Sequence, residues 1–252
     1  MPARKPHPLG CHNPRVSDRA AMDAIFFRLR TGCQWNALNA TGICSSSSAH
    51  RRFQEWRAAG VFLALWRRGL TTYDALKGID WRWLSADGAM TKAPLGGENT
   101  GPNPTDRGKR GTKRSLLTDG RGVPLALTVA GANRPDFQLL RATLEGLVAR
   151  RPRATRDRPQ GLCLDQGYDY RAVYALLKEF RFTPHVRARG EEATAKRTRG
   201  HRARRWVVER THSGMNRFRA LLVRWDKQDA NYLASLHLAC AYVSFRRAGL
   251  LR

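Results

Sequence analysis

The 252-residue sequence predicts a mixed α/β domain that follows a small all-helical module. Three observations support this prediction. The first 80 residues show only helical periodicity, strand and helix patterns alternate from residue 81 onward, and 46 basic side chains stand against 20 acidic ones. A formal charge of +26 with a hydrophobic fraction of 42% indicates a folded protein that binds a polyanion, and nucleic acid is the default partner of such a chain.

Composition and patterning exclude several classes of protein. The longest apolar stretch, Tyr232 to Phe245, contains polar residues and is too short for a bilayer core of about 30 Å, so we expect no membrane span. Residues 1–14 lack the apolar segment of a secretory signal. The five cysteines are scattered without a CxxC pair, which argues against a disulfide framework or a zinc knuckle. A reducing, cytoplasmic location fits these features.

The basic excess is largest toward the carboxy terminus. Residues 151–252 hold 23 basic and 9 acidic side chains. Clustered guanidinium groups commonly bind phosphate, which favours a nucleic-acid surface in this part of the chain. Adaptation for solubility, or an arginine-rich composition inherited from a high-GC genome, is the alternative explanation of the charge.

The amino-terminal module is expected to consist of helices joined by turns. Ser17-Asp18 is an N-cap signal, and the first helix is predicted to end at Thr31-Gly32. A loop over 32–43 follows, a later amphipathic run covers 61–70, and 74–80 is expected to be a linker. We place a domain boundary near residue 78, which divides a helix-turn-helix-like module, 1–78, from a catalytic domain, 79–252.

A second helix of this module resembles a DNA-recognition helix. It follows the serine run 45–48, and its apolar stripe contains Phe53 and Trp56, whereas His50, Arg51 and Arg52 are predicted to lie off that stripe. Basic side chains on one face of a helix suit the major groove of DNA. The alternative is an ordinary solvated face in a small helical bundle.

The elements beyond residue 80 follow in a defined order. A short strand over 83–87 precedes a flexible basic loop over 94–112, which carries Lys109 and Arg110. A hairpin, a helix, a strand, a helix and a strand come next, and two more helices follow the charged stretch 187–204. Their predicted ranges are 114–118 and 124–130 for the hairpin, 135–148, 161–165, 170–180 and 182–186 for the next four elements, and 205–218 and 231–247 for the last two. This order predicts a ribonuclease-H-like mixed five-stranded sheet with helices on both faces.

Two carboxylates stand at the predicted ends of buried strands. Asp87 follows the first strand and Asp165 the fourth, and in this topology those strands are parallel neighbours. We therefore expect the two side chains to lie side by side. Two like charges at that distance are unfavourable unless a cation sits between them.

A third acid, Glu209, lies in the helix predicted over 205–218. Arg205, His212, Ser213 and Asn216 share its helical face by spacing. Three carboxylates without a thiolate cluster suit hard ions, Mg²⁺ or Mn²⁺, and a pair of such ions is the usual device for phosphodiester chemistry. The alternative is that both aspartates form turns and that Glu209 pairs with a neighbouring arginine.

These residues resemble the DDE transposases of bacterial insertion sequences, in the IS-four/IS-five superfamily. The resemblance extends over nearly the whole chain. Its most specific segments are Leu84 to Gly88, Asn103 to Lys109, Leu164 to Asp169 and Arg205 to His212, with Leu29 to Trp35 and His50 to Trp56 in the helical module.

The resemblance implies a metal-dependent transposase. Asp87, Asp165 and Glu209 correspond to the catalytic acids, which hold two Mg²⁺ or Mn²⁺ ions. Double-stranded DNA is the implied partner, both as terminal inverted repeats and as target, and a homodimer is expected on DNA. The protein would act at the bacterial nucleoid. The residues expected to contact DNA are His50, Arg51, Arg52, Lys109, Arg110, Arg205, Arg210, Asn216 and Arg217.

The glutamate segment departs from the family pattern Y-x2-R-x3-E-x6-K. Arg202 and Asn216 replace its Tyr and Lys, whereas Arg205 and Glu209 match. Arg217, one residue beyond Asn216, is a candidate substitute for the lysine. Gly214 and Ala220 also stand where related sequences carry Trp and Arg, and these departures bear on whether the mobile element is still active.

Two alternatives to a transposase remain open from the sequence. One is a nuclease of the same fold that lacks strand transfer. The other is a non-catalytic DNA-binding protein derived from a decayed element. Phosphodiesterase chemistry based on histidine is less favoured, because the seven histidines are scattered along the chain.

Overall fold

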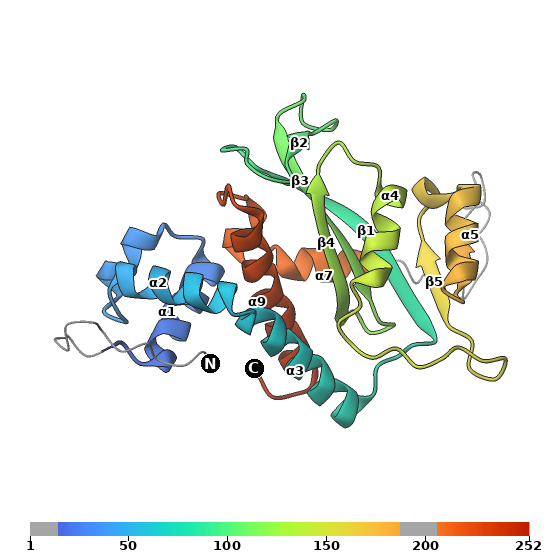
Figure 1. Cartoon of the computed structure of the whole chain (residues 1–252), viewed down its shortest axis with the longest axis horizontal. Coiled ribbons are helices and arrows are strands. Elements are labelled where there is room, and N and C mark those ends of the chain that lie inside the picture. The colour runs from blue at the N-terminus through green and yellow to red at the C-terminus, as the bar shows by residue number, and fades with distance from the viewer. Residues whose placement is uncertain (1–14, 187–205, 252) are drawn as a thin grey trace.

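A mixed six-stranded sheet forms the centre of the computed structural model, which describes residues 15–186 and 206–251 (Figure 1). β3 lies between β1 and β4 and is antiparallel to both, whereas β1, β5 and β6 are parallel to one another. The predicted mixed sheet is confirmed, including the parallel contact between its first strand and the strand near residue 161. The strands are β1 (Trp83–Lys92), β2 (Gly101–Pro102), β3 (Arg110–Thr118), β4 (Pro124–Gly131), β5 (Gly161–Leu164) and β6 (Thr183–Val186).

Two strands are longer than the sequence predicts. β1 continues past Asp87 because its second half pairs with β3, from Ser85 opposite Thr118 to Lys92 opposite Gly111. β3 begins at Arg110, so the predicted basic loop over 94–112 is shorter at its end, and it contains the two-residue strand β2, which pairs with the start of β3. The sheet therefore has six strands in place of the predicted five.

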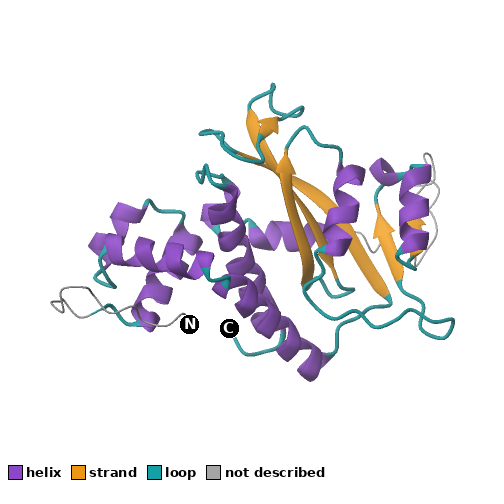
Figure 2. Cartoon of the chain, viewed as in Figure 1, coloured by secondary structure: helices purple, strands orange, loops and turns teal. Residues whose placement is uncertain are grey.

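Helices cover both faces of the sheet (Figure 2). Ser115 of β3 accepts a hydrogen bond from Thr143 of α4 (Asp136–Glu145), with 2.8 Å between the oxygens. The next residue back, Arg114, donates to Asn216, directly after α7 (Trp206–Met215). Successive side chains of a strand point to opposite faces, so α4 and α7 lie on opposite sides of the sheet. α5 (Arg171–Glu179), between β5 and β6, packs against α4.

The amino-terminal part consists of helices, as predicted. Ser17 caps α1 (Asp18–Thr31) by accepting a hydrogen bond from the amide of Ala20 at 3.2 Å, and Gly32 ends this helix with a φ of 69°. A 3-10 helix, η1 (Trp35–Thr41), lies in the predicted loop and precedes α2 (Ser46–Ala58). α3 (Val61–Lys77) includes the first part of the segment expected to be a linker.

The long carboxy-terminal helix α9 (Asp229–Arg247) lies beside α3 (Figure 1). The contact is close at Gly69, where a Cβ atom would stand 3.1 Å from Cβ of Ser244. One cluster of buried apolar residues extends from α1 through the sheet to α9. The division of the chain near residue 78 stays a prediction.

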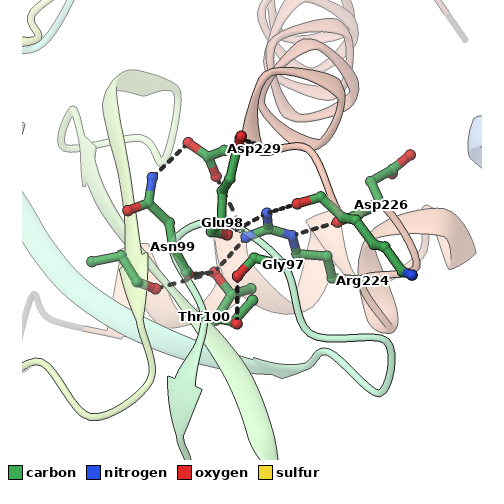
Figure 3. Close-up of polar contacts among 10 residues, drawn as sticks. Gly97, Glu98, Asn99, Thr100, Arg224, Asp226 and Asp229 are labelled. Atoms are coloured by element: carbon green, nitrogen blue, oxygen red, sulfur yellow. Dashed lines mark hydrogen bonds and ion pairs between the residues drawn. The ribbon is translucent and has the colours of Figure 1, made fainter.

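A buried arginine connects the carboxy-terminal helix to the sheet (Figure 3). Arg224 follows α8 (Arg219–Leu222) and is fully buried, with 0% of its surface exposed. Its guanidinium donates to the hydroxyl of Thr112 at 3.1 Å, to the carbonyl of Glu98 at 2.7 Å and to the carbonyl of Asp226 at 2.9 Å. Asp229 lies 3.4 Å from it and supplies the opposite charge.

The segment after β1 is held against the start of α9 by the same network (Figure 3). The side chain of Asn99 donates to Asp229 at 2.8 Å, and the carboxylate of Glu98 accepts from the Asp229 amide at 2.9 Å. Gly97 has a φ of 112°, and a Cβ atom there would lie 2.2 Å from the carbonyl oxygen of Lys227. This close approach of two backbones requires glycine.

The segment between α8 and α9, together with the start of α9, also contacts the amino-terminal helices. Arg28 of α1 is buried and forms an ion pair with Asp226, with 3.6 Å between the charged atoms. Arg57 of α2 donates to the side chains of Gln228 and Asn231 at 2.9 Å each. The segment between α8 and α9 therefore contacts both the sheet and the helical module.

Two further features concern the whole of the described chain. None of its described helices is long and apolar enough to cross a membrane. Cys33, Cys44 and Cys240 are free thiols, and Cys11 lies outside the described residues.

Replacing Arg224 with alanine is expected to lower the free energy of unfolding by about 3–5 kcal/mol, because Asp229 and two backbone carbonyls lose a buried cationic donor. Arg224→Lys should recover only part of this loss, since a single ammonium cannot reach all of the acceptors. Urea denaturation measures both effects. Arg82→Ala, which removes an exposed ion pair with Asp80, is the control and should leave the denaturation midpoint close to that of the wild type. Equal losses in Arg224→Ala and Arg82→Ala would contradict the central role of the network.

The stability of the α3–α9 contact is expected to depend on pH through His237. This residue packs against the ring of Trp66, and burial lowers its pKa to about 4. Between this value and the ordinary value of about 6.5, the unfolded chain binds a proton that the folded chain does not, so stability falls as the pH decreases. From pH 7 to pH 5 the wild type should lose about 1–2 kcal/mol more than His237→Gln. Denaturation curves at both pH values test this, and identical losses would show that His237 does not titrate as stated.

Candidate active site

Parallel pairing of β1 with β5 places two carboxylates at the same point of the sheet. Ser85 is opposite Cys163, and Asp87 and Asp165 each follow two residues later. Asp165 comes directly after β5, as predicted. The prediction that Asp87 ends its strand is wrong, because β1 continues to Lys92 in antiparallel pairing with β3. β5, the strand parallel to β1, ends beside Asp87, and the carboxylate of Asp87 is therefore half-exposed.

Backbone amides hold both carboxylates. Oδ1 of Asp87 accepts from the amide of Gly88 at 2.8 Å. Oδ1 of Asp165 accepts from the amide of Gly167 at 2.8 Å, and in this way caps the short 3-10 helix η2 (Gln166–Tyr168). A carboxylate that accepts from a backbone amide has a restricted orientation.

The third predicted acid, Glu209, is on an exposed position of α7. Two contacts attach this helix to the sheet and to the hairpin between β3 and β4. The hydroxyl of Thr211 donates to the carbonyl of Gly122 at 2.9 Å, and Nε2 of His212 lies 3.3 Å from the carbonyl oxygen of Asp87. The second contact connects the helix that carries Glu209 with the residue that supplies the first acid.

His212 lies three residues after Glu209 in α7, a spacing that keeps the two on neighbouring positions of the helix surface, and it is buried against the sheet whereas Glu209 is exposed. Burial, together with the nearby guanidinium of Arg114, lowers the pKa of His212 to about 3. The imidazole is therefore neutral at physiological pH. Because its partner is a carbonyl oxygen, Nε2 carries the proton and donates.

The donor chemistry of the site suits a hard divalent cation. Asp87 and Asp165 supply only oxygen ligands, the type that Mg²⁺ and Mn²⁺ prefer. Among the described residues, however, no group of three or more His, Cys, Asp or Glu side chains is gathered closely enough to hold a metal ion. Glu209 comes from a separate element, α7.

The structure adds Asp136 and Tyr168 to the surroundings of the site. The sequence indicated Asp136 only as the start of a helix, and Tyr168 only as part of a family segment. A Cβ atom on Gly88 would stand 1.8 Å from Oδ1 of Asp136, so this carboxylate lies directly beside the backbone that follows Asp87. The sequence signal for this contact was the glycine after Asp87, because a glycine in a strand indicates that another group approaches the backbone closely.

Most of the residues predicted to contact DNA are exposed. Arg210 also donates to the carbonyl of Arg121 at 3.0 Å and lies over the ring of Trp206. The exposed members of the predicted set are His50, Arg51, Lys109, Arg110, Arg210 and Arg217.

Arg52 does not lie off the apolar stripe of α2, and that prediction is wrong. Its side chain is buried and forms an ion pair with Asp18 of α1. It also lies over the ring of Trp56 at 5.2 Å and donates to the carbonyl of Val16. Arg52 therefore joins two helices of the module, because a buried cation is tolerated where it is paired and hydrogen-bonded.

Asn216 is also engaged within the protein. Its side-chain oxygen accepts a hydrogen bond from Arg114 at 2.8 Å, and Arg114 is almost fully buried. α7 ends at Met215, so Asn216 and Arg217 lie in the turn before α8 and outside the longer helix that the sequence predicted. Gly214 has open space around the position of a Cβ atom. Arg202 and Arg205 lie outside the described residues.

Two protein families match the chain, one over its larger part and one over its amino-terminal part. Residues 72–244 match the family described as "Transposase DDE domain", and the chain belongs to this family. Residues 1–66 match the family "Putative transposase of IS4/5 family". The chain is therefore an insertion-sequence transposase of the DDE class, and DNA is its partner.

Two curated proteins of Burkholderia cepacia are similar to the chain. The "Putative transposase for insertion sequence element IS402" is 34% identical over 158 residues, which are 61% of this chain and 73% of that protein. The "Insertion element IS402 uncharacterized 16.2 kDa protein" is 36% identical over 90 residues, which are 35% of this chain and 61% of that protein.

Among solved structures, the chain is similar to the catalytic domain of Mos1 mariner transposase, at 12% identity and a TM-score of 0.32, covering 74% of this chain and 94% of that one. The mariner Mos1 paired end complex with Mg gives 14% identity and a TM-score of 0.37, covering 98% and 80%. The ribonuclease-H-like assignment rests on the strand order and on the family match.

Asn216 provides a test of how α7 is attached. Because it accepts from a buried guanidinium, Asn216→Lys should bring a second cation to Arg114 and lower the free energy of unfolding by about 1–3 kcal/mol. Asn216→Asp keeps an acceptor and adds the opposite charge, so its stability should equal or exceed that of the wild type. Thermal unfolding of both variants measures the difference. A stable Asn216→Lys would show that Arg114 does not depend on this partner.

Proposed function

We propose that this transposase cuts the ends of its own mobile element and joins them to target DNA, with Asp87, Asp165 and Glu209 as the catalytic acids. The observation that carries the proposal is the adjacency of Asp87 and Asp165 on parallel strands in a chain of the DDE family. Glu209 is included because α7 is bonded to the backbone of Asp87 through His212.

The three carboxylates would hold two divalent ions, Mg²⁺ or Mn²⁺. When bound, such ions lower the pKa of the attacking hydroxyl and stabilise the leaving oxygen of a phosphodiester. The chain itself restricts the orientation of two of the ligands, since Gly88 donates to one oxygen of Asp87 and Gly167 donates to one oxygen of Asp165.

The exposed cations would bind the phosphate backbone. His50 and Arg51 lie on α2, Lys109 directly before β3, Arg110 at the start of β3, and Arg217 after α7. Arg205 stays part of this proposal, on the strength of the family resemblance. Phosphate contacts of this kind set affinity and make it dependent on salt, with little selectivity for sequence.

The reaction would proceed by two in-line displacements. Water attacks the phosphodiester at the end of the element, and this step releases a 3′-hydroxyl. That hydroxyl then attacks a phosphodiester of the target, so no covalent bond between protein and DNA is required. Two ends must be cut together, which implies two active sites and hence a homodimer on the terminal inverted repeats. The place of action would be the bacterial nucleoid.

A second candidate is a DNA-binding protein that no longer cuts DNA. It is favoured by the finding that no group of three or more His, Cys, Asp or Glu side chains is gathered closely enough to hold a metal ion within 15–186 and 206–251. This candidate shares the basic surface with the first and differs only in its lack of Mg²⁺-dependent cleavage.

The deciding experiment is cleavage of a terminal-repeat duplex by Asp165→Asn in Mg²⁺. The substitution keeps the shape of the side chain and removes its charge, so cleavage and joining of a pre-cut 3′ end should fall by about 100-fold or more. Asp157→Asn, in an exposed loop, is the matched control and should retain wild-type rates.

Three outcomes separate the candidates. Wild-type cleavage by Asp165→Asn would show that the assignment of the site is wrong. Binding without cleavage by the wild-type protein in Mg²⁺ and Mn²⁺ would support the DNA-binding candidate. Cleavage without joining would identify a nuclease.

A further inference from the structure

A basic hairpin, residues 101–111, extends from one edge of the sheet. It consists of β2, a turn and the start of β3, and it projects beyond the rest of the sheet (Figure 1). It contains Asn103 to Lys109, one of the segments that most resemble the transposase family. Lys109 and Arg110 belong to the proposed phosphate-binding surface, whereas the turn itself has no part in the function derived so far.

Asn103 organises the turn of the basic hairpin. Its backbone carbonyl accepts from the amides of Asp106 at 3.2 Å and Gly108 at 3.0 Å, and its amide donates to the carbonyl of Lys109 at 2.8 Å. Its side-chain oxygen accepts from the amide of Thr105 at 3.0 Å and from the hydroxyl of the same residue at 2.9 Å. The segment that the sequence predicts as a flexible loop therefore has a defined, internally hydrogen-bonded shape.

Arg107 has a backbone conformation that is unfavourable for arginine. Its φ is 53°, and the φ of Gly108 is 71°. The amide of Lys109 donates to the carbonyl of Asp106 at 3.0 Å, which closes a turn of type I′ around these two residues. The first central position of such a turn favours Asn, Asp or Gly, because a left-handed backbone crowds a larger side chain. Strained residues of this kind cluster at functional sites, so the arginine requires a functional explanation.

The cations of the basic hairpin are exposed and available to a partner. Arg107, Lys109 and Arg110 are exposed, and none of them forms an ion pair or a side-chain hydrogen bond with another described residue. Asp106, the one acid of the hairpin, is paired with Lys92 at the end of β1, with 3.3 Å between the charged atoms. Three positive charges therefore remain on the hairpin, and a polyanion is their complement.

The basic hairpin is held in a fixed relation to the proposed catalytic site. Thr112, directly after it, accepts a hydrogen bond from the buried Arg224 at 3.1 Å and donates to the carbonyl of Asn99 at 3.0 Å. Lys92, which pairs with the acid of the hairpin, is five residues beyond Asp87 in β1. At about 3.3 Å per residue, Lys92 lies roughly 17 Å from Asp87, which is less than one turn of duplex DNA.

We propose that the basic hairpin binds the phosphate backbone of duplex DNA that extends from the catalytic site, with Arg107 as a direct phosphate contact; this inference rests on the proposed function. The type I′ turn presents Arg107 beside Lys109 and Arg110, and the contact with phosphate offsets the strain of its backbone. Guanidinium and ammonium groups without acceptors in the protein suit phosphate oxygens. Such contacts position the duplex and do not read its sequence.

The test compares Arg107→Asn with a matched control, Arg181→Asn, in the full-length chain. Arg181 is also an exposed arginine with a left-handed φ, 55°, but it lies between α5 and β6, at the edge of the sheet opposite β2. Each substitution removes one positive charge and introduces a residue that tolerates this backbone conformation. Binding to a terminal-repeat duplex and to a duplex of shuffled sequence is measured by fluorescence anisotropy, without Mg²⁺ and over a range of salt concentrations.

Arg107→Asn should weaken binding of both duplexes by about 5- to 10-fold at about 0.1 M salt. The slope of log K against log salt concentration should become shallower by about one, because one phosphate contact is lost. Its melting temperature without DNA should equal or exceed that of the wild type, because the strain at residue 107 is relieved. Arg181→Asn should bind both duplexes as the wild type does, and Arg107→Lys, which keeps the charge, should retain most of the affinity.

Four results would overturn the proposal. Two of them are wild-type DNA affinity in Arg107→Asn and equal weakening in Arg107→Asn and Arg181→Asn. A loss confined to the terminal-repeat duplex would show that the hairpin reads bases and does not bind phosphate. A lower melting temperature of Arg107→Asn without DNA would assign the arginine a structural role.

Cleavage by the wild-type protein separates failure of this inference from failure of the proposed function. Binding without metal does not depend on the catalytic acids. If the wild type cuts and joins DNA while Arg107→Asn binds DNA normally, only the role of the hairpin is wrong. If the wild type does not cut DNA in Mg²⁺ while Arg107→Asn binds DNA more weakly, the hairpin still binds DNA and the catalytic proposal is wrong.

Discussion

The arrangement of the site depends on the parallel pairing of β1 with β5. This pairing brings Asp87 and Asp165 to the same level of the sheet although 77 residues separate them in the sequence. Everything else near the site is attached to one of these strands. η2 begins at Asp165, α7 bonds to the carbonyl of Asp87, and the carboxylate of Asp136 rests on Gly88. A change of register by one residue would turn one carboxylate to the opposite face.

β3 positions helices on both sides of the sheet, because two successive basic side chains on it bind residues on opposite faces. Lys113 pairs with Asp136 at the start of α4, and Arg114 donates to Asn216 after α7. Both side chains are buried, which is favourable only where each has a suitable partner. The strand next to β1 therefore fixes the helices on both sides of the sheet. The positive charges of Lys113 and Arg114 also reduce the net negative charge of the carboxylate-rich site.

The sequence predicts the features that depend on local pattern. Helix starts such as Ser17, the hairpin between β3 and β4, and the strand order follow from capping, turn and periodicity rules, and the adjacency of Asp87 and Asp165 follows from the order. The extension of β1 past Asp87 does not follow from these rules, because Gly88 and Ala89 have low strand propensity and the pairing with β3 decides their conformation.

Buried polar residues were the other feature that the sequence could not predict. A helical pattern assigns every arginine and histidine to the solvent face, yet Arg52 and His212 are buried because Asp18 and the carbonyl of Asp87 satisfy them. Arg224 and Glu98 meet across 126 residues of chain, and η2 packs against α4 only after the sheet has formed. Such contacts depend on tertiary structure, so no single segment encodes them.

The central claim is that Asp87 and Asp165 bind the same catalytic cation. The most direct measurement is an anomalous difference map at the manganese edge, from crystals of the full chain grown with Mn²⁺ and a pre-cut terminal-repeat duplex. The account predicts a peak within about 2.5 Å of oxygens from both aspartates, with the carboxylate of Glu209 beside it. A peak bound to neither aspartate, or Mn²⁺ held only by Asp136 or by surface residues, would contradict it.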